Sequence, residues 1–198
     1  MIRNIFRIAG WALSCVAVPV FAAPTPADFH RAVYTLHERQ IAQHMIRIEE
    51  ERGDYQGAAA ARYHYVDTLY YDAVSGRLLS HVRRDAEMPE YVHIVEVNIY
   101  ENGKLVRDFG SLTLPWTPLQ PTRTFINLHQ YNGQLHSFRQ YNFFGDVGYE
   151  SCTGALAGKP VRIALDESEI NETSAATVEY KACFEGVSAD WKRYQVPH

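Results

Sequence analysis

Two histidines, His129 and His136, have the spacing that most directly suggests chemistry in this sequence. They flank the dipeptide Asn132-Gly133, which predicts a two-residue hairpin turn, and in that register they oppose each other across two antiparallel strands. Cross-strand neighbours have Cβ atoms about 4.5–5.5 Å apart, close enough for both imidazoles to reach one zinc or copper ion. His93 or His64 is a candidate third ligand from an adjacent strand. The alternative interpretation is a polar sheet face that carries two histidines without binding metal.

Cys152 and Cys183 form the second candidate pair. They are the two cysteines left once an export signal containing Cys15 is removed, and two cysteines in an exported chain predict one disulfide. The competing interpretations are a redox pair or two metal thiolates. Neither is favoured, because the sequence has no Cys-x-x-Cys motif and the two thiols lie far apart along the chain.

No motif of a common enzyme class occurs in the sequence. Gly-x-Ser-x-Gly, a Gly-rich phosphate loop, a Cys-x-x-Cys-His haem site and His-Glu-x-x-His are all absent. His30, His37 and His44 recur every seven residues on an expected helix, where neighbours are about 10.5 Å apart, too far for two of them to bind one ion. They predict a solvated or partner-facing stripe. The sequence therefore favours a non-enzymatic protein, with a hydrolase that lacks a recognisable motif as an alternative.

Two predicted hairpins position the histidine pair. Asn-Gly at residues 102–103 and 132–133 lies each time between runs of alternating apolar and polar residues. The first turn pairs Glu101 with Lys104, Tyr100 with Leu105, and Ile99 with Val106. The second pairs His129 with His136 and Leu128 with Ser137. Because side chains alternate along a strand, each face carries one set of residues. The expected core-facing set is Ile126, Leu128, Leu135 and Tyr141. The expected polar set is Asn127, His129, Gln134 and His136.

A helical segment precedes the sheet. Residues 24–51 predict a helix from apolar residues at helical spacing, and the alanine-rich residues 55–62 allow a second, short one. Residues 63–71 favour a strand over a continued helix, because aromatic and β-branched residues suit a pleated surface. Residues 161–165 and 177–184 complete the strands. We therefore predict an α+β fold: an N-terminal helical segment (residues 23–62) packed with an antiparallel meander of about eight strands (residues 63–198), with one disulfide.

Residues 1–22 have the organisation of a secretory signal peptide. Arg3 and Arg7 precede an apolar run over residues 8–21 and a small-residue cleavage site before Ala23. The run is too short for a bilayer span and is interrupted by Pro19. Lipoprotein processing before Cys15 is the alternative. We expect a periplasmic or secreted protein with no stable membrane span after signal cleavage.

Composition narrows the expected partners. The 198-residue chain has a formal net charge of −4, and loss of the two signal arginines makes it more acidic, which argues against nucleic acid as a partner. All 13 tyrosines follow the signal segment, most of them on expected strands. An exposed row of tyrosines suits a protein, peptide or glycan partner, whereas half-buried strand residues are the alternative. We expect a binding or envelope-associated protein of unknown ligand, with a metal-binding protein as the alternative.

Overall fold

The structure, a computed structural model, describes residues 25–56, 62–117, 120–184, 186–187 and 191–197. A helix, α1 (Pro26–Gln43), precedes nine strands. The strands are β1 (Ile46–Gln56), β2 (Arg62–Asp72), β3 (Leu78–Asp85), β4 (Val92–Glu101), β5 (Lys104–Thr113), β6 (Pro121–Asn132), β7 (Leu135–Tyr141), β8 (Val147–Leu156) and β9 (Lys159–Asp166). Two short helices, α2 (Glu172–Ala175) and α3 (Val178–Phe184), and a 3-10 turn, η2 (Trp191–Tyr194), follow.

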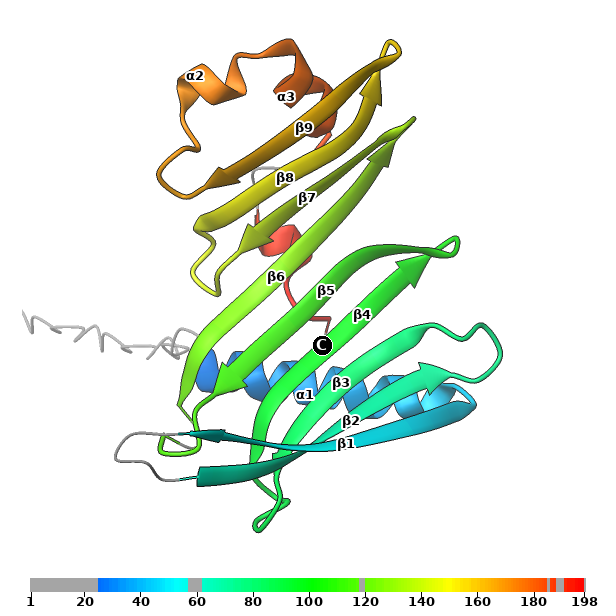
Figure 1. The fold of residues 1–198 in the computed structure, drawn as a ribbon, viewed down its shortest axis with the longest axis vertical. Coiled ribbons are helices and arrows are strands. Elements are labelled where there is room, and N and C mark those ends of the chain that lie inside the picture. The colour runs from blue at the N-terminus through cyan, green and yellow to red at the C-terminus, as the bar shows by residue number, and fades with distance from the viewer. Residues whose placement is uncertain (1–24, 57–61, 118–119, 185, 188–190, 198) are drawn as a thin grey trace, which may run out of the picture.

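Each strand pairs antiparallel with the next one along the chain (Figure 1), so the order in the sheet is β1 to β9. This up-and-down meander confirms the predicted α+β fold, with nine strands where about eight were expected. Because every connection joins neighbouring strands, short turns suffice throughout the sheet.

A capping box fixes the start of α1. The Thr25 hydroxyl accepts a hydrogen bond from the Asp28 backbone N–H (3.2 Å), and the Asp28 carboxylate accepts one from the Thr25 backbone N–H (3.0 Å). Pro26 occupies the first helical position, where a missing N–H costs no hydrogen bond. The residues that α1 buries against the sheet are spaced by four, three and one: Phe29, Val33, Leu36 and His37.

The predicted continuation of this helix to residue 51 is wrong. His44 is extended, and β1 begins at Ile46 and pairs along its whole length with β2. Met45 and Ile48, which prolonged the helical periodicity, are 70% and 54% exposed and bury no helical face. In the predicted short helix at residues 55–62, Tyr55 and Gln56 belong to β1, and residues 57–61 lie outside the described residues.

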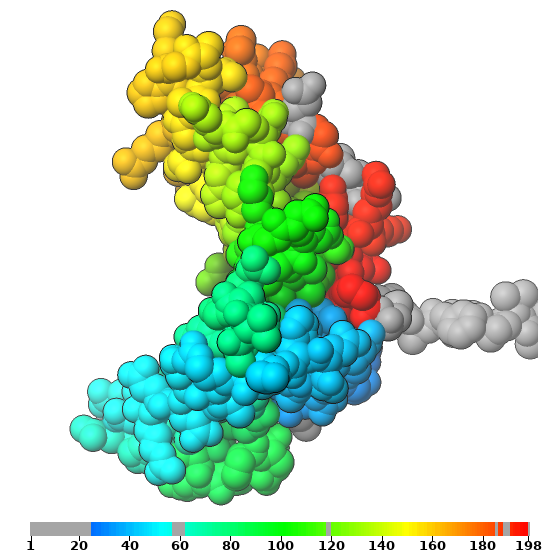
Figure 2. Space-filling view, turned by 90° about the vertical axis from the view of Figure 1, so that its right-hand side faces the viewer, coloured from blue at the N-terminus to red at the C-terminus, as the bar shows by residue number. Residues whose placement is uncertain are grey.

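Both α1 and α3 pack on the same side of the sheet. Helix α1 lies against β3 to β6, and α3 lies against β6 to β8 (Figure 1). We call this side the covered face; it carries Val97, Phe109, Ile126 and Tyr141. The other side, the open face, carries their strand neighbours Asn98, Asp108, Asn127 and Gln140. Figure 2 shows the surface hollowed on the side away from α1 and the C-terminal residues, between the first strands (cyan) and the last (yellow).

The main core is a row of side chains across the covered face. Val97 pairs with Phe109, Phe109 with Ile126, and Ile126 with Tyr141, and all four are 2% exposed or less. Phe29 and Val33 of α1 pack on this row, together with Val196 near the C-terminus. Burial of these side chains removes apolar surface from water and drives the helix onto the sheet.

The predicted disulfide is confirmed, and it joins β8 to α3. Cys152 and Cys183 are bonded, and both are buried beside Leu135, Val161 and Phe184. The predicted strand at residues 177–184 is wrong, because Val178–Phe184 is the helix α3. Its buried residues, Cys183 and Phe184, lie on the side that meets β7 and β8. Within the described part of the chain, no helix combines the length and apolarity needed to cross a membrane.

Candidate functional site

The open face carries two groups of charged, polar and aromatic side chains that contact one another through hydrogen bonds and ring stacking. One, on β2, β3 and β4, is the Asp67 cluster: Tyr65, Asp67, His81, Arg83 and Glu96. The other, on β5, β6 and β7, is the Asp108 cluster: Asp108, Asn127, His129, Tyr131 and His136. The strand register brings each cluster together, since Asp67 pairs with Arg83, His81 with Glu96, and Asp108 with Asn127.

Asp67 is the centre of the first cluster. Arg83 donates two hydrogen bonds to its carboxylate, at 2.8 and 2.7 Å. His81 Nε2 lies 2.6 Å from the same carboxylate, and His81 Nδ1 lies 3.3 Å from the Glu96 carboxylate. The Arg83 guanidinium also stacks 3.7 Å from the centre of the Tyr65 ring. Charged groups on three strands are thereby held in fixed positions.

The charges of this cluster support each other. Burial on its own would lower the pKa of His81, but hydrogen bonds to Glu96 and Asp67 outweigh it, and the pKa is raised. Burial would raise the pKa of Asp67, but Arg83 and His81 reverse that effect and lower it. The two carboxylates therefore favour the protonated form of His81, and the neighbouring guanidinium and imidazole favour the ionised form of Asp67.

In the Asp108 cluster, His129 links a carboxylate to a second imidazole. His129 Nε2 lies 2.8 Å from an Asp108 carboxylate oxygen, and His129 Nδ1 lies 3.2 Å from His136 Nε2. The Asn127 side-chain amide donates to the other Asp108 oxygen (2.6 Å), and the Gln140 side-chain amide donates to Oδ1 of Asn127 (3.0 Å). Burial and the neighbouring His129 lower the pKa of His136.

The predicted cross-strand register of these two histidines is wrong. His129 opposes Phe138 and His136 opposes Tyr131, because Asn132 pairs with Leu135 in the turn. The shift is two residues, which keeps every side chain on its predicted face. His129 and His136 are therefore diagonal neighbours, and their side chains still meet. In the first hairpin Glu101–Lys104 and Tyr100–Leu105 are confirmed, but a bulge pairs Ile99 with Arg107.

His93 and His64, the candidate third ligands, lie elsewhere. His93 is 3% exposed, and its Nε2 is 3.5 Å from an Asp85 carboxylate oxygen. His64 is exposed on β2, opposite Asp54 of β1. Across the described residues, no three His, Cys, Asp or Glu side chains are grouped so that they could hold a metal ion.

Aromatic rings form a patch at the end of the open face nearest the Asp67 cluster. Tyr55 stacks on Tyr63 and on Tyr65, with ring centres 6.1 and 5.4 Å apart, and Trp116 packs against Tyr63 at 5.6 Å. We call Tyr55, Tyr63, Tyr65 and Trp116 the aromatic patch. The Tyr65 ring lies over Gly53, where an added Cβ would fall 2.3 Å from its hydroxyl oxygen, so glycine makes this packing possible.

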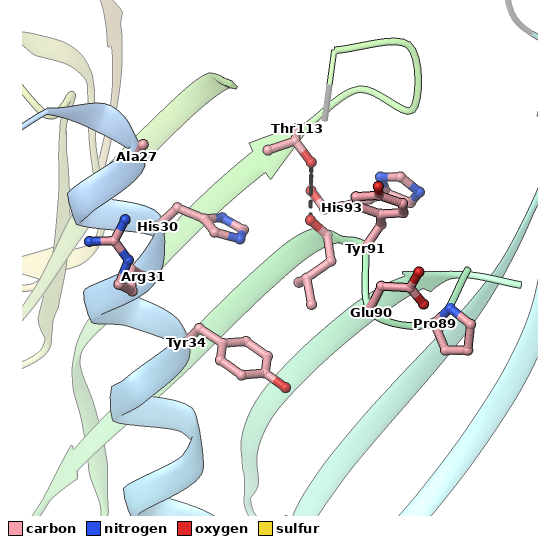
Figure 3. A pocket seen from close by; sticks show the side chains of 10 residues that line it. Ala27, His30, Arg31, Tyr34, Pro89, Glu90, Tyr91, His93 and Thr113 are labelled. Atoms are coloured by element: carbon pink, nitrogen blue, oxygen red, sulfur yellow. Dashed lines mark hydrogen bonds between the residues drawn. The ribbon is translucent and has the colours of Figure 1, made fainter. Parts of the chain in front are cut away.

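A cavity of about 390 Å³ lies on the other side of the sheet, between α1 and the start of β4. His30 and Tyr34 extend from α1 toward Tyr91, whereas Arg31 points away (Figure 3), and Val92 also lines the cavity. His30 is hydrogen-bonded to Ser111 (3.1 Å), and His37, two turns further along α1, is buried and hydrogen-bonded to Ser80 (2.7 Å). The predicted solvated or partner-facing stripe is therefore wrong for His30 and His37, which face the sheet, and His44 lies just after the end of α1.

Sequence reasoning found His129 and His136 but missed the partners that hold them and the whole Asp67 cluster. Asp67, His81, Arg83 and Asp108 stand in no motif. They meet only through the register of β2 to β6, which contains bulges at Tyr70/Tyr71 and Arg83/Arg84. One signal was available in the sequence. Tyr65 and Asp67 are two residues apart, as are His81 and Arg83, so each pair lies on one face of its strand, and that face is polar and aromatic.

Comparison with protein-family models found no match to this chain. Comparisons with curated proteins and with solved structures found none either. No activity is therefore transferred from a relative. A fold alone does not define a function, so the function has to be argued from the chemistry of the open face.

Proposed function

We propose that this chain is an exported protein-binding module that docks a folded partner protein on its open face. The observation that carries the proposal is the aromatic patch with Arg83 stacked at its edge. Tyrosine, tryptophan and arginine are the residues most enriched where protein interfaces concentrate their binding energy. Here all three occur together on a sheet face that no described helix covers.

The packing of the patch supports this role. Its rings contact each other and Arg83, so the contact surface is ordered before a partner arrives and less side-chain entropy is lost on binding. Trp116 is 47% exposed and offers a large apolar surface at the edge of the patch. A surface built from several rigid rings is typical of a protein interface.

The charges beside the patch also suit a protein partner. Asp67 is already paired with Arg83 and His81, and Glu96 with His81. Covering these groups leaves none of them as an unpaired buried charge, which is the main electrostatic penalty at an interface. The arrangement favours a partner with polar and apolar groups at its surface over a strongly charged polymer.

Export is part of the proposal. The organisation of residues 1–22 and the Cys152–Cys183 disulfide both support a periplasmic or secreted location, because structural disulfides persist in oxidising compartments. Cell fractionation with mass spectrometry of the N-terminus tests it. A cytosolic protein that retains residues 1–22 would contradict export.

Site-specific photo-crosslinking in the native host envelope tests the docking surface. A photoreactive residue at position 63 is expected to give one discrete protein adduct. The matched control is position 178, since Val178 is 70% exposed but lies on α3, behind the sheet. With the captured partner purified, Trp116→Ala is expected to weaken affinity about 30-fold, corresponding to about 2 kcal/mol.

Two outcomes would contradict protein docking at the open face. One is equal crosslinking from positions 63 and 178, which indicates random collision. The other is an adduct at position 63 that resists proteases and contains sugar, which indicates a glycan ligand.

A further inference from the structure

We propose that His129 Nδ1 and His136 Nε2 form a two-nitrogen binding site for a divalent transition metal, Zn²⁺ or Cu²⁺, on the open face. This site lies on β6 and β7, apart from the aromatic patch at the β1 and β2 end. It goes beyond the docking function and does not depend on it.

The distance between the two nitrogens fits one metal ion. Imidazole nitrogens bind zinc at about 2.0–2.1 Å, so nitrogens 3.2 Å apart would subtend about 100–105° at the ion. That angle is close to the tetrahedral value, and copper accepts similar imidazole ligands. The nitrogen spacing therefore already suits a chelate, and binding requires each ring to turn so that its lone pair points at the ion instead of along the line between the two nitrogens.

Asp108 supplies the partner that a metal-bound histidine usually has. Histidines that bind metals commonly donate their other ring N–H to a carboxylate, which fixes the tautomer and raises the basicity of the ligating nitrogen. The contact between His129 Nε2 and Asp108 (2.8 Å) places the proton on Nε2 and leaves the Nδ1 lone pair directed at His136. The carboxylate itself is oriented by the hydrogen bond from Asn127 (2.6 Å).

In the ion-free cluster, one of the two nitrogens proposed to bind the metal, Nε2 of His136, carries a proton that must move when the metal binds. With Nδ1 of His129 as acceptor, His136 donates from Nε2 across the 3.2 Å contact. When the metal binds, the proton of His136 transfers from Nε2 to Nδ1 of the same ring, both imidazoles stay neutral, and both lone pairs reach the ion. Tyr131 stacks on the His136 ring (4.7 Å), which limits its rotation.

Water fills the remaining coordination positions in this proposal, since the described residues hold no group of three protein ligands. An ion with two protein ligands keeps open positions, as catalytic zinc sites do. One positive group lies nearby: the Lys104 ammonium is 4.7 Å from the centre of the Tyr131 ring. Asp108 provides the compensating negative charge on the opposite side of His129.

Isothermal titration of the disulfide-bonded protein with zinc chloride, and separately with copper sulfate, tests the site. One equivalent is expected to bind saturably. His136→Gln is expected to weaken affinity at least about tenfold, and Asp108→Asn about 10- to 100-fold, as outer-shell substitutions do. The matched control is His81→Gln, which removes the histidine of the Asp67 cluster and should leave affinity unchanged.

Nitrogen-15 NMR of the histidine rings gives a second readout that is independent of affinity. Zinc is expected to shift Nδ1 of His129 and both ring nitrogens of His136, Nε2 because it binds the ion and Nδ1 because it gains the proton. No ring nitrogen of another histidine should shift. Unchanged affinity in folded His136→Gln, absence of saturable binding, or zinc-induced shifts at other histidines would overturn the proposal. If circular dichroism shows that His136→Gln is unfolded, the nitrogen-15 shifts of the unmodified protein decide whether the two histidines bind the metal.

Discussion

The two faces of one sheet use alternate residues of the same strands for different purposes. On the covered face Val82, Val95, Val97, Phe109 and Ile126 have no exposed surface. On the open face the neighbouring positions hold ion pairs, linked imidazoles and stacked rings. The covered face supplies the apolar burial that stabilises the fold. The open face is thereby left available for polar and aromatic contacts.

The pKa values of histidines also differ between the two faces. His37 of α1 is buried against the covered face, and burial, assisted by the positive charge of Arg84, lowers its pKa to about 4. Burial lowers the pKa of His30 as well. On the open face, carboxylates on both sides raise the pKa of His81 despite its partial burial. Loss of solvent dominates on one face, and specific acid partners dominate on the other.

Truncation of one aromatic residue on each face gives the sharpest test of this contrast. Phe109→Ala should lower the free energy of unfolding by about 3–5 kcal/mol, because it leaves a cavity under α1. Phe125→Ala, on the adjacent strand but on the open face, should cost less than about 2 kcal/mol, because its ring is already partly solvated. Urea unfolding with an unchanged m-value measures both. Equal losses would mean that the open face is a second core.

Removal of the disulfide measures how much the covalent link between β8 and α3 contributes to the stability of the fold. Cys152 and Cys183 are 31 residues apart, a loop for which chain entropy gives about 3–4 kcal/mol. Cys152→Ala/Cys183→Ala should lose that amount, and adding a reductant to the unmodified protein should reproduce the loss. If the double variant is as stable as the parent, packing of Phe184 and Leu135 alone holds α3 in place.

Local signals predicted the sheet well. Asn-Gly turns gave the two central hairpins, and alternation gave the buried set Ile126, Leu128, Leu135 and Tyr141. The errors occurred where the spacing of apolar residues fits both the helical and the strand periodicity. Met45 and Ile48 fit both a helix and a strand, and pairing with β2 decided for the strand. Cys183 and Phe184 belong to a helix because α3 packs against β6 to β8, and no local pattern encodes that packing.

The candidate site was only half predictable. The sequence correctly placed His129 and His136 on one polar face. Side chains alternate between the two faces of a strand, so a register shift of two residues leaves each side chain on the same face. Their exact pairing was not predicted, since the turn closes at Gly133-Gln134, one residue later than the Asn-Gly motif indicates. The pairing of Asp67 with Arg83 lies beyond a bulge at Tyr70/Tyr71, which shifts the register counted from the turn between β2 and β3 and so sets which side chains of β3 reach Asp67.

The pH dependence of stability tests the covered-face histidine. Because the pKa of His37 is lowered in the folded state, the unfolded chain binds a proton more readily, and stability present above about pH 6.5 is lost as the pH falls toward 4. The loss attributable to His37 is on the order of 3 kcal/mol. His37→Gln, which can retain a hydrogen bond to Ser80, should flatten the stability profile between pH 6.5 and 4 relative to the parent. Parallel profiles would show that His37 is more solvated than its contacts indicate.

The open-face histidine should show the opposite sign with a smaller effect. The pKa of His81 is raised, so its contribution to stability is full below about pH 6.5 and is lost as the pH rises through the folded-state pKa. Proton NMR titration of the His81 ring should give a pKa above the usual value, and Glu96→Gln should bring it down, since that carboxylate is one of its two partners. His37 serves as the internal reference in the same spectra, because Glu96→Gln should leave its titration unchanged. A pKa of His81 below the usual value would mean that burial outweighs the carboxylates on this face too, and the electrostatic distinction between the two faces would not hold.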